Sequence, residues 1–309
     1  MFSLDLSEET IVLKHRSQYR AEIYTFGALL NRYEIMRPDG TWFNAVKGHE
    51  SPQQCRQTLT DGFHSAKLSP FACRVRHGQY EFNGQLHQLE GKFQAAGHAL
   101  HGLMYDCDFA VVQSGEDAQS AWVELAADYR QDDSGYPFAY RLNIVYRLDS
   151  DGLTVTTRAT NTGNRAMPLA DGWHPYFTLG GKVDDWTMQL NSSERLEFDQ
   201  DLVANGNILP DTRFQTALSM QGIALDNSFV LADFDKPACV LSGEKLQLRI
   251  YPDSSYPYLQ IYIPATRDSI ALENLSGAPD GFNNGLGLQV LQAGETRMFA
   301  TRYVLSWQE

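Results

Sequence analysis

Five side chains, far apart along the chain, are of the types that move protons and bind hydroxyl groups. The first is His174, in the segment Asp171-Gly-Trp-His-Pro-Tyr-Phe-Thr178. Because Pro175 disfavours the α region for the residue before it, we expect His174 in an extended backbone among aromatic rings. An imidazole held in this way suits proton transfer, since its pKa can be tuned near neutrality. A buried histidine with one satisfied hydrogen bond fits the segment equally well.

A carboxylate follows an apolar run in Ser269-Ile-Ala-Leu-Glu-Asn-Leu-Ser-Gly277. The run is strand-like, and a loop rich in Pro, Gly and Asn comes after it. A carboxylate at the end of such a strand costs free energy to bury unless it is paired or functional. The same surroundings raise the pKa of a carboxyl group toward that of a useful base. We therefore interpret Glu273 as a candidate base.

Arg74 and His101 are candidates for binding a ligand. Arg74 lies among small and apolar residues on a β-prone run, and we expect Arg76 on the same face. An arginine in such a context has an ion-pair partner or is reserved for oxygens of a ligand, and both readings stay open. In His98-Ala-Leu-His-Gly102 the two histidines would point to opposite faces of a strand, so we reject a metal site. We expect His101 at a strand end, with its ring presented to a cleft.

The last candidate is Asp226, in Ala224-Leu-Asp-Asn-Ser-Phe229, between apolar and turn residues. It either caps a turn or binds a ligand. Aromatic residues near the candidates could stack on the apolar C–H face of a sugar or simply pack in the core. They are Trp173, Tyr176, Phe177 and Phe282.

Short β-strands must position these side chains. The clearest strand is Arg141–Leu148, in which Leu142, Ile144, Tyr146 and Leu148 fall on one face at period 2. Asn83-Gly84 is typical of a type I′ hairpin turn between two further strands. Similar alternation recurs at 19–36, 153–161, 245–251, 258–263 and 296–305, whereas helical periodicity is scarce.

This pattern predicts an all-β protein, a large antiparallel β-sandwich with few short helices. We see no linker and no internal repeat, so we expect a single domain over residues 1–309. Long loops are predicted at 131–137, 199–213 and 276–287.

Composition limits the function classes. The chain has 309 residues and a formal net charge of −13, which argues against nucleic acid and anionic membranes as partners. No run of about 18 apolar residues predicts a membrane span, and the acidic N-terminus does not resemble a signal peptide. Four cysteines without a CxxC pair indicate a reduced, cytoplasmic protein without structural zinc. We expect a small-molecule ligand and a monomer or homodimer.

Taken together, the five segments resemble the aldose 1-epimerase (mutarotase) family. The resemblance covers nearly the whole chain, and it depends on the order Arg, Leu-His-Gly, His-x-Tyr-Phe, Leu-Asp and Leu-Glu. It implies a large antiparallel β-sandwich. It also implies that His174 is the general acid and Glu273 the base, and that Arg74, His101 and Asp226 bind the sugar hydroxyls.

The activity implied is the interconversion of α and β anomers of a free sugar, without a metal, nucleotide or redox cofactor. The chain departs from the family pattern at Cys73, where Asn is common, at Pro175, and at Asn274-Leu275 after the glutamate. These departures leave the sugar open. Alternatives are an epimerase for a phosphorylated or sulfonated hexose, a glycosidase that uses Asp226 and Glu273, and a non-catalytic carbohydrate-binding protein. Lys67, Arg74 and Arg76 lie close enough in sequence to form a basic cluster for a charged substrate.

Overall fold

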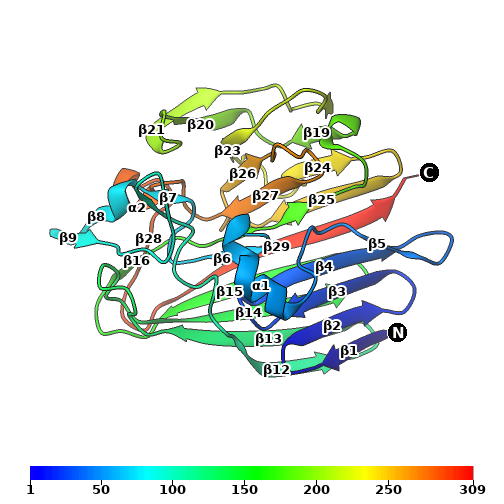
Figure 1. Cartoon of the computed structure of the whole chain (residues 1–309), viewed down its shortest axis with the longest axis horizontal. Helices are drawn as coiled ribbons and strands as arrows, with labels where there is room; N and C mark the ends of the chain where they lie inside the picture. Colours follow the sequence, from blue (N-terminus) through cyan, green and yellow to red (C-terminus); the bar gives the residue numbers. More distant parts are fainter. Residues whose placement is uncertain (309) are drawn as a thin grey trace.

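Antiparallel β-sheets form most of the computed structural model, which describes residues 1–308 (Figure 1). The expected fold class is therefore confirmed. Two short α-helices are present, α1 (Pro52–Thr58) and α2 (Gly281–Asn284), with 3₁₀ turns η1 (Leu59–Asp61), η2 (Arg76–Gly78) and η3 (Val183–Asp185). Among residues 1–308, no helix has both the length and the apolar character needed to cross a membrane.

The largest sheet has nine strands, and β14 (Tyr140–Asp149) shows why it forms. Leu142, Ile144 and Tyr146 are buried on one face, while the residues between them are half-buried. This alternation confirms the period-2 prediction. The other strands, in sheet order around β14, are β12 (Ala110–Glu116), β13 (Ser120–Tyr129), β15 (Gly152–Asn161), β29 (Thr296–Trp307), β25 (Leu246–Pro252), β24 (Cys239–Ser242), β19 (Thr187–Leu190) and β22 (Leu218–Ser219).

The eight-stranded sheet carries most of the candidate residues. Its strands follow the order β21 (Ala204–Pro210), β20 (Glu194–Phe198), β23 (Asp226–Val230), β26 (Tyr258–Tyr262), β27 (Ile270–Leu275), β17 (Gly172–His174) and β6 (Ala66–Leu68). β18 (Tyr176–Phe177) pairs with β27 outside this order. The predicted loop over 199–213 is wrong in part, because β21 lies inside it, and α2 likewise lies inside the predicted loop over 276–287.

Smaller sheets complete the fold. The five-stranded sheet contains β1 (Phe2–Leu6), β2 (Thr10–His15), β3 (Tyr19–Tyr24), β4 (Leu29–Met36) and β5 (Trp42–Asn44). A three-stranded sheet contains β10 (Gln94–Ala95), β11 (His98–Leu100) and β7 (Arg74–Val75). Two pairs remain, β8 (Gln79–Phe82) with β9 (Gln85–Gln88), and β16 (Met167–Leu169) with β28 (Gln289–Leu291). Asn83 and Gly84 both have positive φ, as the predicted hairpin turn requires.

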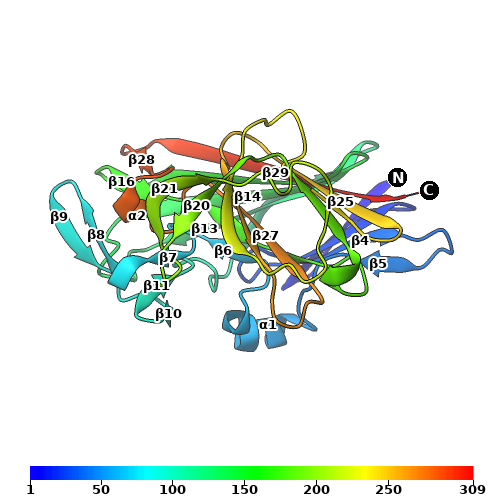
Figure 2. The ribbon, with the colours of Figure 1, turned by 90° about the horizontal axis from the view of Figure 1, so that it is seen from above.

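The core lies where the five-stranded and eight-stranded sheets pack against the nine-stranded sheet. The Tyr19 hydroxyl donates to the Leu305 carbonyl over 2.8 Å, and the Tyr33 hydroxyl donates to the Tyr303 carbonyl over 3.1 Å. On the eight-stranded sheet, the ring of Phe177 packs 5.3 Å from the ring of Tyr303. β29 therefore lies against both sheets. Figure 2 shows β27 and β6 below β29 and β25, on the side where α1 projects.

Candidate active site

All five predicted residues line one cleft of about 360 Å³. The members that can form hydrogen bonds through charged or polar side chains include Arg74, His101, His174, Asp226, Gln260 and Glu273. Apolar and aromatic walls are supplied by Phe63, Leu100, Tyr176, Leu202 and Tyr262. Residues from eight segments of the chain thus meet at a site that no local stretch of sequence defines. The roles assigned to them stay predictions.

The central contact joins His174 and Glu273. His174 Nε2 lies 3.3 Å from Glu273 Oε1, and the two residues are 5% and 2% exposed. The ring of Tyr176 is stacked on His174 with centroids 5.1 Å apart, and the His101 ring meets the same imidazole edge-on at 5.0 Å. Aromatic contacts on two sides therefore fix the plane of the His174 ring.

The backbone around His174 explains the local sequence. Gly172 lies so close to β27 that a Cβ atom there would be 2.6 Å from Leu275 Cδ2 and 3.0 Å from the Asn274 carbonyl oxygen, so a larger residue would require β27 to shift. Pro175 cannot donate a backbone hydrogen bond and separates β17 from β18. The His174 carbonyl accepts a hydrogen bond of 2.9 Å from the Ser65 amide. His174 is therefore held in an extended conformation, as predicted.

Arg74 and His101 are presented by strained turns. Cys73 and His101 have backbone φ angles of 52° and 63°, a region that residues other than glycine rarely adopt. The His101 amide donates to the Cys73 carbonyl over 2.9 Å, which links the two turns. His101 directly follows β11, so the predicted position at a strand end is confirmed. Backbone strain of this kind is concentrated at functional sites.

Asp226 opens strand β23 and does not cap a turn, so that alternative is wrong. The Gln260 amide donates to Asp226 Oδ1 over 2.7 Å, and Gln260 lies opposite Glu273 in the β26–β27 register. Gln260 therefore binds Asp226 and lies on the strand next to Glu273. Sequence reasoning missed it, although an isolated amide in the apolar, alternating run 258–263 was a usable signal.

Burial changes the protonation of the central pair. It raises the pKa of Glu273 well above its ordinary value, and the nearby Asp226 carboxylate adds to this rise. Burial also lowers the pKa of His174 to about 3, which differs from the expectation of a value near neutrality. Both shifts favour uncharged side chains, since removing charges from water is costly. The pKa of Asp226 is raised by burial as well.

Several buried polar atoms at the cleft have no hydrogen-bond partner among residues 1–308. They are Arg74 Nε, His101 Nδ1, His174 Nδ1, Gln260 Oε1 and Glu273 Oε2. Buried polar atoms are normally satisfied, so a group of unsatisfied ones in a cleft indicates a polar ligand. Arg74 Nε is one of these atoms, and no carboxylate oxygen of residues 1–308 lies within 4.0 Å of the Arg74 guanidinium, so the alternative of a structural ion pair is wrong.

Two basic residues that the sequence grouped with Arg74 are placed elsewhere. Lys67 is fully buried, and its Nζ lies 2.5 Å from Asp171 Oδ1 and 4.3 Å from the Trp173 ring centroid. β7 ends at Val75, so Arg76 does not share a face with Arg74 and instead pairs with Asp199 and Asp201. The basic cluster that the sequence left open does not form.

Of the four aromatic residues considered as sugar-stacking groups, Tyr176 lines the cleft. Phe177 packs against Tyr303, and Phe282 packs against Tyr80 in the core. The rings that do reach the cleft beside Tyr176 belong to Phe63 and Tyr262. Within residues 1–308, no group of three or more His, Cys, Asp or Glu side chains is arranged to hold a metal ion.

Comparison with known proteins identifies the family of this chain. The aldose 1-epimerase family model matches residues 9–304, so the chain belongs to the aldose 1-epimerase family. The protein YihR of Escherichia coli K12, described as uncharacterized, is 28% identical over 246 residues, which cover 76% of this chain and 77% of YihR. Galactose mutarotase of Sus scrofa is 22% identical over 262 residues, covering 79% of this chain and 72% of that protein.

Solved structures share the whole fold. A GalM/aldose epimerase homologue from C. elegans has a TM-score of 0.86 at 17% identity and covers 100% of both chains. A galactose 1-epimerase from Lactobacillus acidophilus has a TM-score of 0.83 at 20% identity, covering 100% of this chain and 99% of that one. At these identities the likeness concerns the fold alone. The resemblance inferred from the sequence is confirmed at the level of the family.

Proposed function

We propose that the protein is an aldose 1-epimerase that interconverts the α and β anomers of a free aldose, with His174 as acid and Glu273 as base. The observation that carries the proposal is the 3.3 Å separation of His174 Nε2 and Glu273 Oε1 at the cleft. One imidazole and one carboxyl group at this distance can serve two proton transfers on two oxygen atoms bonded to the same carbon, the C1 hydroxyl and the ring oxygen.

In the proposed reaction, the Glu273 carboxylate takes the proton of the C1 hydroxyl while protonated His174 gives a proton to the ring oxygen. The bond between C1 and the ring oxygen breaks, and an open-chain aldehyde forms. Rotation about C1–C2 then presents the other face of the carbonyl. Ring closure reverses both proton transfers, so the enzyme returns to its starting state without any cofactor.

The pKa shifts are compatible with this scheme because the reactive pair and the uncharged pair contain the same number of protons. A carboxylic acid beside a neutral imidazole differs from a carboxylate beside an imidazolium only in the position of one proton. Burial favours the uncharged pair. Hydrogen bonds from substrate hydroxyls to Glu273 would favour the carboxylate. We propose that the substrate itself completes the charged, reactive arrangement.

The remaining polar groups would orient the ring. Arg74 offers an unpaired guanidinium, and Asp226 and Gln260 offer a linked carboxylate and amide. His101, whose pKa is lowered well below its ordinary value by burial, would be a neutral donor and acceptor of hydrogen bonds. Such fixed, partly unsatisfied groups suit a polyhydroxylated ligand, since each hydroxyl both donates and accepts.

Other readings make different demands on the cleft. An epimerase for a phosphorylated or sulfonated hexose needs cations, yet Lys67 is buried against Asp171 and Arg76 is paired with two aspartates, which leaves Arg74. A glycosidase would use Asp226 and Glu273 and leave His174 without a role. A binding protein would need no acid–base pair.

Two assays separate these possible functions, an NMR measurement of anomer exchange and a hydrolysis assay on an aryl glycoside. Saturation-transfer NMR of D-galactose, D-glucose, glucose 6-phosphate and a 6-sulfonated hexose measures anomer exchange with and without the protein, with Glu273→Gln as the matched control. We expect faster exchange of at least one sugar with wild type and none with the control. Release of reducing sugar from an aryl glycoside would favour the glycosidase, and binding of a sugar without faster exchange would favour the binding protein.

A further inference from the structure

The hairpin between β20 and β21 supplies one wall of the cleft from outside the acid–base machinery. Its turn, residues 199–203, is called the hairpin tip here, and Leu202 is the residue of the tip that lines the cleft. Leu202 has φ of 57°, in the left-handed region that leucine rarely adopts. Leu202 is half-buried and lies beside a polar cleft. A strained residue persists only where the surrounding structure holds it, and such residues are concentrated at functional sites.

Hydrogen bonds within the tip hold this conformation. Asp199 Oδ1 accepts from the Asp201 amide over 2.9 Å and from the Val203 amide over 3.2 Å. The Leu202 amide donates to the Asp199 carbonyl over 3.1 Å. The Asp199 side chain and the backbone thus close the turn together, which holds Leu202 in this conformation.

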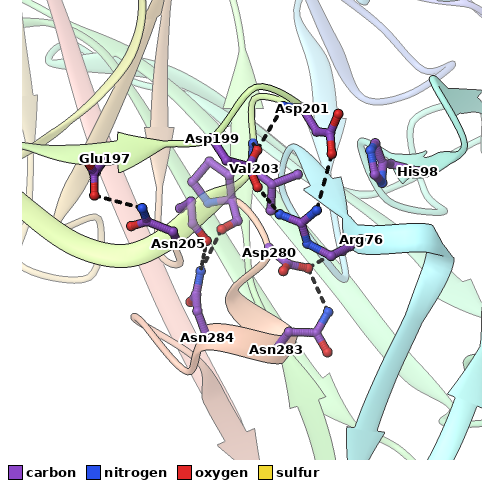
Figure 3. Close-up of polar contacts among 12 residues, drawn as sticks. Arg76, His98, Glu197, Asp199, Asp201, Val203, Asn205, Asp280, Asn283 and Asn284 are labelled. Atoms are coloured by element: carbon purple, nitrogen blue, oxygen red, sulfur yellow. Dashed lines mark hydrogen bonds and ion pairs between the residues drawn. The ribbon is translucent and has the colours of Figure 1, made fainter.

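Arg76 ties the tip to the segment that carries Arg74. The Arg76 guanidinium contacts Asp199 and lies 3.4 Å from Asp201 Oδ2, as Figure 3 shows. The Arg76 amide donates to Asp280 Oδ1 over 2.9 Å, and Asn283 donates to the same oxygen over 2.7 Å. The backbone around Arg76 is therefore anchored to the loop before α2, while its side chain reaches the tip.

We propose that Leu202 is a substrate-contacting residue that lies against a C–H surface of the bound sugar, and that Arg76 is a positioning residue that holds Leu202 there. The inference rests on the proposed function for the identity of the ligand. Leu202 offers no hydrogen bond, so it suits ring carbons and not hydroxyl groups. Asp199, Asp201 and Arg76 are between 31% and 41% exposed, so the ion pairs hold the tip only weakly and are sensitive to salt.

Replacing Leu202 with glycine tests the contact. Glycine adopts a positive φ without strain, so Leu202→Gly should fold at least as well as wild type while losing the side chain. We expect the KM for D-galactose to rise about fivefold or more, as the loss of a partly buried leucine contact implies. Gln131→Gly is the matched control, since Gln131 is exposed with φ of 66° and does not line the cleft. An unchanged KM in Leu202→Gly overturns the proposal.

Replacing Arg76 tests the positioning role. Arg76→Met should raise KM about two- to fivefold at low salt, with a smaller effect on kcat, as exposed ion pairs allow. Added salt should move the KM of wild type toward that of the variant. Arg141→Met is the control, because Arg141 makes a comparably exposed pair of 2.9 Å with Asp128 away from the cleft. A wild-type KM that does not depend on salt and equals that of Arg76→Met contradicts this role.

A direct measurement keeps this inference separate from the proposed function. In protein with labelled leucine methyl groups, we expect nuclear Overhauser contacts between Leu202 and ring protons of D-galactose or D-glucose. Contacts without accelerated anomer exchange would leave the tip proposal standing and reject the epimerase. Normal anomer exchange with no contact to Leu202 would reject the tip proposal alone.

Discussion

His174 Nε2 and Glu273 Oε1 lie 3.3 Å apart, although these residues are 99 positions apart in the sequence. Their strands, β17 and β27, pair directly only at Gly172 and Leu275. A Cβ atom at Gly172 would lie 3.0 Å from the Asn274 carbonyl oxygen, so the strand that carries His174 lies close to the strand that carries Glu273 at this point. A buried histidine–glutamate contact thus forms where two strands of the eight-stranded sheet meet.

Removing either member of the pair should abolish most of the activity. We expect Glu273→Gln and His174→Asn each to slow anomerisation by about 10²-fold or more, because each positioned proton transfer contributes that much. Polarimetry on a fresh solution of the α anomer measures the rate, and circular dichroism checks folding. Glu81→Gln, an exposed substitution on β8, is the control. If both active-site variants relax the sugar as fast as wild type, the assignment of acid and base is wrong.

The same carboxyl group should also set part of the pH dependence of stability. Burial raises the pKa of Glu273 well above 4.5, so the folded protein keeps a proton that the unfolded chain loses as pH rises. The stability that this group contributes is therefore complete below about pH 4.5 and decreases as pH rises toward the folded pKa.

Glu273→Gln removes this titration, so the variant should gain free energy of unfolding relative to wild type as pH rises above about 4.5 toward the folded pKa of Glu273. The slope is at most about 1.4 kcal/mol per pH unit for one group. Urea unfolding at several pH values measures the difference, with Glu81→Gln again as the control. A gain that is constant across this range would mean that Glu273 is not buried as a protonated acid.

Arg74 should matter through the shape of its guanidinium as much as through its charge. In Arg74→Lys the charge remains, but the planar fork that can bind two ligand oxygens is lost. Because Arg74 has no ion-pair partner among residues 1–308, we expect little change in the free energy of unfolding and a KM increased by about tenfold. Steady-state kinetics on D-galactose, with Arg141→Lys as control, tests this. Equal KM values for Arg74→Lys and wild type would argue against a binding role.

Much of the fold could be predicted because alternating burial along a strand and the conformation of a tight turn depend on residues that are neighbours in the sequence. On β14, the buried and half-buried residues alternate as the sequence does, and the Asn83-Gly84 turn needs only its own two residues. Arg76 shows the limit. The chain leaves strand β7 after Val75, and the aspartates that bind Arg76 lie more than 100 positions away. No local pattern could reveal this partner, so the predicted shared face with Arg74 was wrong.

The sequence predicted which five residues belong to the candidate site, but it did not predict how burial shifts their pKa values. The resemblance to a family placed five residues in one site, whereas each segment alone left a structural alternative open. Gln260 was missed because its significance comes from Asp226 and Glu273 on the neighbouring strands. The pKa of His174 could not be anticipated either, since it depends on how completely other segments cover the ring.

Removing one partner of the buried Lys67–Asp171 ion pair should destabilise the fold, whereas removing both charges should cost much less. Lys67 and Asp171 are both fully buried, and Asp171 Oδ1 also accepts a hydrogen bond of 2.7 Å from Tyr256. Lys67→Met leaves a buried carboxylate without its cation and should lower the free energy of unfolding by about 3–5 kcal/mol. Lys67→Met with Asp171→Asn removes both charges and should recover a large part of this loss in urea unfolding. A double variant that is no more stable than Lys67→Met would refute the electrostatic explanation.

Gly102 should be indispensable because the backbone of another segment occupies the space of a side chain. A Cβ atom at Gly102 would lie 2.4 Å from the Ser69 carbonyl oxygen, and the residue has φ of 82°. Gly97 has the same φ of 82° but no neighbouring atom within 4 Å, so Gly97→Ala measures the cost of the conformation alone, about 1–2 kcal/mol. Gly102→Ala adds the clash with Ser69 and displaces His101, so it should lose clearly more stability than Gly97→Ala and should also weaken sugar binding. Thermal unfolding and KM for D-galactose compare the two variants. Equal losses of stability would show that the turn after β11 can move away from Ser69 at little cost, and His101 would then not be rigidly placed.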